Sequence, residues 1–254
     1  MKRIAASFVL TAALAAPQAG AQQPSTLDPM ADAARINVRL GVEYMKQGQL
    51  AVAREKIEKA LQQNPDDPSV QMGAGLLYEQ MLQPAVAERH YRQALKIQHD
   101  NPEAQNALGA FLCRNGKPKE GEEMFVKAAR NPLYRTPEVA YTNAGVCARR
   151  SGRLDKSEEY LRLAVGQRAQ YAEALLQMAG VSFDRGNHLQ ARAFLQRYLA
   201  VTQGGPDVLL LGYQVEKALG DQPAADDFAR RLRTQFPDSP EARILDDQSS
   251  KESP

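Results

Sequence analysis

Six glycines recur along this chain inside apolar patterns of helical spacing, at successive intervals of 34, 34, 36, 35 and 32 residues. They are Gly41, Gly75, Gly109, Gly145, Gly180 and Gly212. About twelve residues after each glycine lies a second small residue, which gives a second column: Ala53, Ala87, Gly121, Ser157, Ala191 and Ala225. A unit of this length cannot bury a hydrophobic face alone, so the copies must stack on one another.

Each copy predicts two helices joined by a tight turn, which we term helix A and helix B. The small residues allow the two helices to approach closely, and a bulky residue four positions after the second column fills the groove between them. Turn signals such as Asn115-Gly116 separate A from B, and prolines such as Pro102 mark the start of the next repeat. This is the pattern of tetratricopeptide repeats.

We therefore expect an all-α fold, an α-solenoid of six tetratricopeptide repeats whose helix–turn–helix pairs wind into a right-handed superhelix. The repeat domain is expected over residues 34–245, after a flexible lead-in at 22–33 and before a polar tail at 246–254. Its repeats are expected at 34–67, 68–101, 102–137, 138–172, 173–204 and 205–240, followed by a short C-terminal helix. Two extra residues lengthen the loop near 131–137, between repeats three and four.

Residues 1–21 have the features of a secretory signal peptide. Lys2 and Arg3 precede an apolar segment too short to span a bilayer, and Ala19-Gly20-Ala21 supplies small residues for cleavage. The whole chain has 32 basic and 30 acidic residues, so removal of this segment would leave a formally neutral protein. That balance argues against a nucleic-acid partner, and the signal peptide predicts export to the periplasm.

The sequence offers no constellation typical of catalysis. His90, His99 and His188 lack the spacing of metal ligands, and acidic pairs such as Glu122-Glu123 are expected on a solvated outer face of helix B. No phosphate-binding loop or nucleophile motif occurs. We expect no enzyme, no cofactor, no metal site, no small-molecule substrate and no transmembrane segment.

Cys113 and Cys147 are the two cysteines of the chain. They fall on helix A of repeats three and four, which are neighbours in a stacked array. In an oxidising compartment they are expected to form a disulfide across the lengthened loop. The alternative is a pair of buried thiols that fill small holes in the core.

The concave face, lined by helix A, is the candidate partner-binding surface. An apolar strip is expected in repeats one and two, and arginines in repeats three to five. The predicted groove consists of Val38, Val42, Met45, Met72, Leu76, Arg114, Arg149 and Arg150. A partner segment with apolar residues and acidic flanks would suit it. The alternative is that the apolar strip packs between helices.

Several segments resemble the PilW/PilF family of type IV pilus biogenesis and stability proteins over residues 33–245. They are Pro84–Leu95, Asn106–Cys113, Asn143–Cys147, Ala191–Tyr198 and Leu209–Gly212. The resemblance implies a pilotin-like protein that binds the outer-membrane secretin, or other pilus assembly components, and promotes secretin assembly, pilus formation and twitching motility.

Members of that family are typically lipoproteins, whereas this chain has no cysteine before Cys113. We therefore expect a periplasmic protein that associates with the outer membrane through its partner. The alternative is a tetratricopeptide scaffold for another envelope machine, in outer-membrane protein assembly or cell-wall synthesis.

Overall fold

The computed structural model describes residues 28–250, which form thirteen α-helices and, within that range, no strand. The predicted signal peptide lies outside the described residues. The first six helices are α1 (Pro29–Lys46), α2 (Leu50–Gln63), α3 (Pro68–Gln80), α4 (Pro84–Ile97), α5 (Pro102–Arg114) and α6 (Pro118–Arg130). The remaining seven are α7 (Pro137–Arg150), α8 (Leu154–Gln167), α9 (Ala172–Asp184), α10 (His188–Leu199), α11 (Pro206–Ala218), α12 (Gln222–Gln235) and α13 (Pro240–Ser250).

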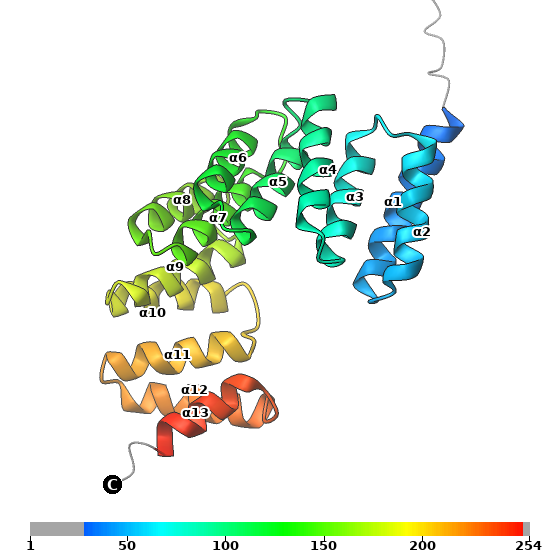
Figure 1. Ribbon diagram of the computed structural model, residues 1–254. Helices are drawn as coiled ribbons and strands as arrows, with labels where there is room; N and C mark the ends of the chain where they lie inside the picture. The colour runs from blue at the N-terminus through cyan, green and yellow to red at the C-terminus, as the bar shows by residue number, and fades with distance from the viewer. Residues whose placement is uncertain (1–27, 251–254) are drawn as a thin grey trace, which may run out of the picture.

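Odd-numbered helices α1 to α11 are the A helices of six repeats, and each packs on the B helix that follows it. Successive A helices also pack on one another, whereas the backbones of successive B helices stay apart throughout residues 28–250 and are bridged by side chains, as between Arg92 of α4 and Glu120 of α6 at 3.5 Å. The array therefore bends with the A helices inside and the B helices splayed apart outside. Figure 1 shows the stack turning from upright helices at α1–α4 to nearly horizontal ones at α11 and α12. The expected solenoid of tetratricopeptide repeats is confirmed.

In five of the six repeats the recurrent glycine of helix A lies directly against helix B. A Cβ atom on Gly109 would lie 2.9 Å from the carbonyl oxygen of Gly121, so these two backbones touch. In the first four repeats the bulky residue of helix B covers the glycine, as Leu161 covers Gly145. The last two repeats differ: Arg149 of the preceding repeat covers Gly180, and Phe228 covers Gly212. Phe228 takes this role because the expected bulky position holds only Ala229.

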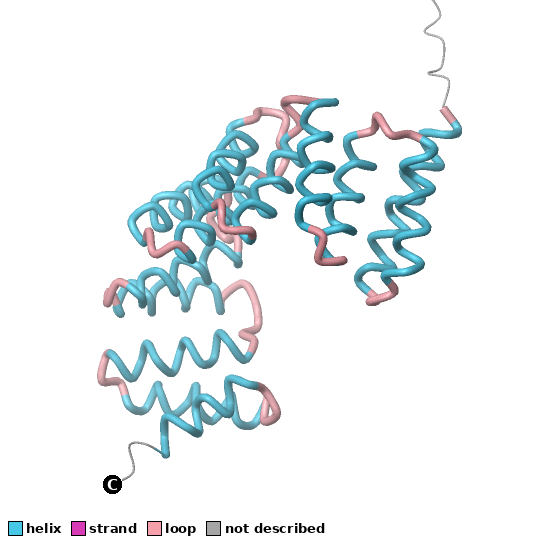
Figure 2. The backbone as a smooth tube through the Cα atoms, viewed as in Figure 1, coloured by secondary structure: helices cyan, strands magenta, loops and turns pink. Residues whose placement is uncertain are grey.

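The A–B turns share one backbone conformation. In each turn a backbone N–H donates a hydrogen bond to the carbonyl five residues earlier, near the end of helix A. In the first repeat the N–H of Gln49 donates to the carbonyl of Tyr44 at 2.9 Å. The motif places one residue in the left-handed region, where five of the six repeats carry glycine with φ between 73° and 78°. Repeat two has Leu82 instead, with φ 58° and a side chain that is 87% exposed. The A–B turns and the loops between repeats lie at opposite ends of the helices (Figure 2).

Both ends of the expected domain need correction. Helix α1 begins at Pro29, inside the expected lead-in of 22–33, because the Asp28 carboxylate accepts a hydrogen bond from the N–H of Met30 at 3.0 Å and caps the helix. Helix α13 continues to Ser250, so the expected tail of 246–254 begins inside a helix. Asp246, its first residue, forms an ion pair with Arg233 at 2.8 Å.

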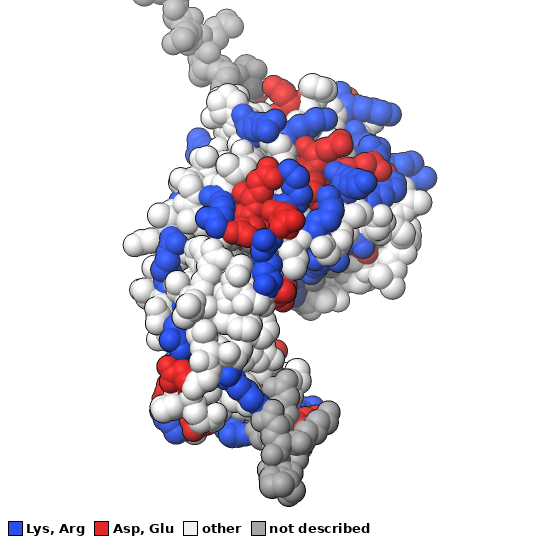
Figure 3. Space-filling view, turned by 90° about the vertical axis from the view of Figure 1, so that its left-hand side faces the viewer, with Lys and Arg blue, Asp and Glu red and all other residues white. Residues whose placement is uncertain are grey.

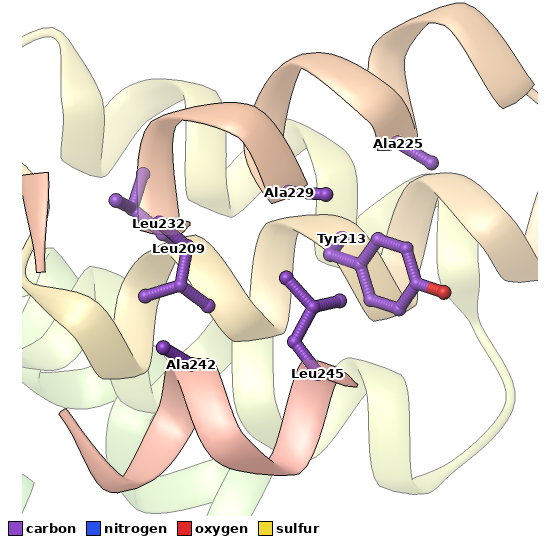
Figure 4. Close-up of a cluster of buried hydrophobic side chains, with 7 residues drawn as sticks. All are labelled: Leu209, Tyr213, Ala225, Ala229, Leu232, Ala242 and Leu245. Carbon is purple, nitrogen blue, oxygen red and sulfur yellow. The ribbon is translucent and has the colours of Figure 1, made fainter. Parts of the chain in front are cut away.

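Helix α13 covers the last repeat. Ala242 and Leu245 pack against Leu209 and Tyr213 of α11 and Leu232 of α12, and all five side chains are buried (Figure 4). Without α13 the outermost apolar face of the array would be open to water, and a terminal capping element is what a solenoid requires for solubility.

We predict that Gly109→Ala lowers the free energy of unfolding by about 1–3 kcal/mol, because the added Cβ has no room against the backbone of Gly121. Gly166→Ala is the matched control. No atom lies within 4 Å of a Cβ at that exposed position of α8, so alanine should stabilise the helix by about 0.5–1 kcal/mol. Urea denaturation followed by circular dichroism measures both, and equal effects at the two sites would contradict the close approach.

Leu82→Gly should raise the free energy of unfolding by about 0.5–1 kcal/mol, since a leucine pays a steric cost in the left-handed region that glycine avoids. Little burial is lost because the leucine side chain is exposed. The reciprocal change Gly116→Leu, in the equivalent turn, should destabilise by a similar amount. The same denaturation experiment tests the pair, and a loss of stability in Leu82→Gly would refute the assignment of strain.

Candidate functional site

The predicted groove residues all lie on A helices: α1, α3, α5 and α7. Because consecutive A helices pack side by side, each one covers part of its neighbour, and only the remaining surface is open on the inside of the bend. The exposure of each predicted residue therefore depends on the next repeat as well as on its own helix.

The apolar half of the groove is largely a joint between α1 and α3. Met45 is 4% exposed and belongs to a core cluster with Ile57 and Leu77, so its expected exposure is wrong. Val38, Val42 and Leu76 are half-buried against the same cluster. A Cβ on Gly73 of α3 would lie 2.9 Å from a methyl group of Val38, which shows how closely the two helices meet.

Met72 is also half-buried, and it lines a shallow hollow beside Arg35 and Asp67. The interpretation of the strip as interhelical packing thus holds for Met45. The other four residues are half-buried and are not among the large apolar side chains that the structure exposes. A binding role for those four stays a prediction.

The basic half of the groove is mostly paired. Arg114 on α5 donates two hydrogen bonds to the Glu79 carboxylate on α3, at 2.8 and 3.0 Å. Arg149 on α7 donates to Asp184 on α9 at 2.6 Å. Arg150 is exposed and has no ion pair with any residue in the described range. Of the three predicted arginines, Arg150 alone offers an uncompensated charge to a partner.

These contacts form a ladder of polar links along the inner face. Between the two ion pairs, Asn143 of α7 donates a hydrogen bond to Asn106 of α5 at 3.0 Å. The links join α3 to α5, α5 to α7 and α7 to α9. They tie successive repeats together at the surface, where such pairs contribute modestly to stability.

Glu79 also accepts a hydrogen bond from the hydroxyl of Tyr91 at 3.2 Å. Burial raises the pKa of Tyr91, and the nearby Glu79 carboxylate raises it further. The hydrogen bond and charge of Glu79 raise the pKa of Arg114. Neither group titrates near neutral pH, so this cluster serves as a fixed polar contact and has no features of an acid–base centre.

The outer side of the array also differs from expectation at Glu122. The sequence suggested a solvated carboxylate, but Glu122 on α6 is 4% exposed. Arg153, which begins the next B helix, donates to both of its carboxylate oxygens. Similar links join B-side residues of other neighbouring repeats, as between Lys117 and Glu88 at 3.0 Å. On the side of the molecule that Figure 3 faces, a group of acidic side chains is surrounded by basic ones.

The three histidines take separate positions. His90 stacks on Tyr78 with ring centroids 5.3 Å apart, His188 lies beside Phe183, and His99 is exposed. In residues 28–250 no group of three or more His, Cys, Asp or Glu side chains is placed to hold a metal ion. None of the helices in that range is long and apolar enough to cross a membrane.

Cys113 on α5 and Cys147 on α7 form a disulfide, with their Cα atoms 5.8 Å apart. The bond joins the A helices of repeats three and four, on either side of the lengthened loop that connects α6 to α7. It therefore links the two repeats independently of the packing of α6.

Comparisons with known proteins agree with this architecture. Tetratricopeptide-repeat family models match residues 44–110 and 112–172. The chain is 25% identical to the type IV pilus assembly protein PilF of Pseudomonas aeruginosa strain PAO1, over 87% of this chain and 88% of that protein.

Two solved structures are similar over nearly their whole length. The crystal structure of PilW, a widely conserved type IV pilus biogenesis factor, has 30% identity and a TM-score of 0.76, covering 84% of this chain and 97% of that one. The structure of Pseudomonas aeruginosa PilF shares the fold with 20% identity and a TM-score of 0.72, covering 86% and 99%.

Replacing both cysteines, Cys113→Ala with Cys147→Ala, should lower the free energy of unfolding by about 2–4 kcal/mol, because the bond restricts the unfolded chain across 34 residues. Urea denaturation with and without reductant measures the effect. Reductant should destabilise the native sequence and leave the double variant unchanged. Two thiols open to alkylation in the unreduced, exported protein would show that the disulfide does not form.

Proposed function

Because this chain belongs to the PilW/PilF family of tetratricopeptide proteins of type IV pilus biogenesis, we propose that it is a periplasmic scaffold that promotes assembly of the outer-membrane secretin. Similarity to PilW along 84% of the chain is the observation that carries this proposal. Tetratricopeptide arrays act by binding proteins on surfaces that the repeats present. The proposed role is therefore binding, with no chemical step.

Two features support a location in the periplasm. The first 21 residues have the pattern of a signal peptide. The disulfide between Cys113 and Cys147 suits an oxidising compartment, whereas such bonds are rare in the cytosol. Attachment to the outer membrane would then come through the partner.

The inner face is the surface we propose for the secretin. Its A helices present half-buried apolar side chains at α1 and α3, and an unpaired cation at Arg150 of α7. The ion pairs of Arg114 and Arg149 leave most of that face neutral. A partner segment would therefore gain mainly from shape and apolar contact in repeats one and two, with one acidic contact near repeat four.

A deletion strain tests the function. It should lose secretin multimers on immunoblots, surface pili and twitching motility, and a plasmid copy should restore all three. Unchanged multimers in the deletion strain would refute the secretin role. Loss of another envelope assembly, with pili intact, would favour a scaffold for a different machine.

Arg150→Glu should weaken capture of the secretin by the purified protein about three- to tenfold, since reversing one rim charge costs roughly 1 kcal/mol. The matched control is Lys59→Glu on α2, which reverses an exposed charge on a B helix. Pull-down from envelope extracts, with circular dichroism to verify folding, measures both variants. If the two variants capture the secretin equally well, the inner face of α7 is not part of the interface.

A further inference from the structure

A hollow with a volume of about 860 Å³ lies on the outer side of the array, between the B helices α4 and α6. Leu95 of α4 and Met124 of α6 form its walls, and Leu108 of α5 forms its floor. Leu95 and Met124 pack on the buried Leu108, so the lining is continuous with the core of repeats two and three. Its volume is in the range of sites that take a ligand or a few side chains.

The hollow follows from two features of the fold. The backbones of successive B helices stay apart in the described part of the chain, so a space opens between α4 and α6. The lengthened loop after α6 then closes one end of this space with Pro132 and Leu133. Leu133 is 79% exposed, so a large apolar side chain is open to a partner at the end of the hollow.

Basic side chains surround the apolar lining. Arg92 and Lys96 lie along α4, and Lys127 and Arg130 along α6. Arg92 pairs with Glu88 at 2.7 Å and with Glu120 of α6 at 3.5 Å, but none of the other three forms an ion pair with a residue between 28 and 250. Asp100 is the one carboxylate among the lining residues. The hollow is therefore apolar at its centre and positively charged on both sides.

Gln105 of α5, which is 8% exposed, also lines the hollow. Its side-chain nitrogen donates to the carbonyl of His99 at 3.3 Å. Its side-chain oxygen is buried without a hydrogen-bond partner, the one such side-chain atom found among the described residues. An unpaired buried acceptor is costly, and a donor brought by an occupant would relieve that cost.

We propose that this hollow is a second docking site, which takes a short segment of a partner protein that carries apolar side chains flanked by carboxylates. The apolar lining and Leu133 would hold the apolar side chains, and Lys96, Lys127 and Arg130 would pair with the carboxylates. A backbone N–H of the segment would be the donor for Gln105.

The placement of the charges favours a peptide over a lipid. The cations are spaced at i, i+4 on α4 and i, i+3 on α6, so each helix presents two charges about one helical turn apart. Several carboxylates along an extended segment can match this arrangement, whereas a lipid with a single head group would need the cations gathered at one end. The site lies on the outer B helices and does not depend on which partner binds the inner face.

The test is fluorescence anisotropy with the full exported chain and a panel of labelled hexapeptides. Each peptide has two central apolar residues, varied over Leu, Ile, Val, Met and Phe, between two acidic residues on either side. We expect binding by some members, and none by peptides with lysine flanks or with serine at the centre. Lys127→Glu with Arg130→Glu should weaken binding at least about tenfold, and so should Leu133→Asp.

The matched control is Arg39→Glu with Lys59→Glu, which reverses two exposed charges in repeat one and should leave binding unchanged. Because Leu133 is exposed, Leu133→Asp should keep its melting temperature, so a loss of binding would not reflect unfolding. The proposal is overturned if no peptide binds at about 1 mM, or if the hollow variants bind as the control does. Binding to phosphatidylglycerol vesicles that needs Lys127 and Arg130, without peptide binding, would identify a lipid site instead.

Discussion

The close approach of helix A to helix B at a small residue is the contact on which the whole array depends. At Gly109 and Gly121 the two backbones touch, and elsewhere a side chain such as Leu161 lies directly over the glycine. Each contact fixes how one helix crosses the next, and each repeat contacts mainly its neighbours. The same local geometry, repeated along the chain, sets the bend that places A helices inside and leaves gaps between B helices outside.

Features that lie within one repeat could be predicted from the sequence. The recurrent small residues, the tight turns and the number of repeats depend on residues fewer than about 40 positions apart, and they can be recognised because they recur at a regular interval. The structure departs from the predicted pattern where the side chain that covers a recurrent glycine comes from an unexpected position. Gly180 is covered by Arg149 of the preceding repeat, and Gly212 by Phe228 beside the expected position. The start of α1 is set by a helix cap at Asp28, and the expected tail begins inside α13, where Asp246 pairs with Arg233.

The candidate site was harder to predict because the exposure of its residues depends on how the next repeat packs against them. Val38 has the helical spacing of a surface strip, but it meets Gly73 of the next A helix, and Met45 is covered in the same way. The pairing of the arginines had a signal in the sequence. Glu79 and Arg114 are 35 residues apart, as are Arg149 and Asp184, so opposite charges one repeat apart on helix A indicate an ion pair across the interface.

The inner and outer faces of the array differ in which charged, polar and apolar groups they leave without a partner. On the inside, neighbouring repeats neutralise one another's charges, and apolar side chains lie partly against the next helix. On the outside, the splayed B helices are bridged at some gaps, as by Arg153 and Glu122 between α8 and α6. The gap between α4 and α6 is also bridged, by Arg92 to Glu120 and by Lys117 to Glu88, but it keeps an apolar lining, three unpaired cations and an unpaired acceptor.

The lengthened loop and the disulfide lie at the same junction, which relates them physically. The two extra residues lie in the loop after α6 that brings Leu133 to the end of the hollow, while α6 itself still packs closely on α7. The bond between Cys113 and Cys147 joins α5 to α7 directly and adds a covalent link across that longer loop. A solenoid of regular repeats would have neither feature. The irregularity therefore gives the outer face a shaped hollow while the inner A helices remain held together.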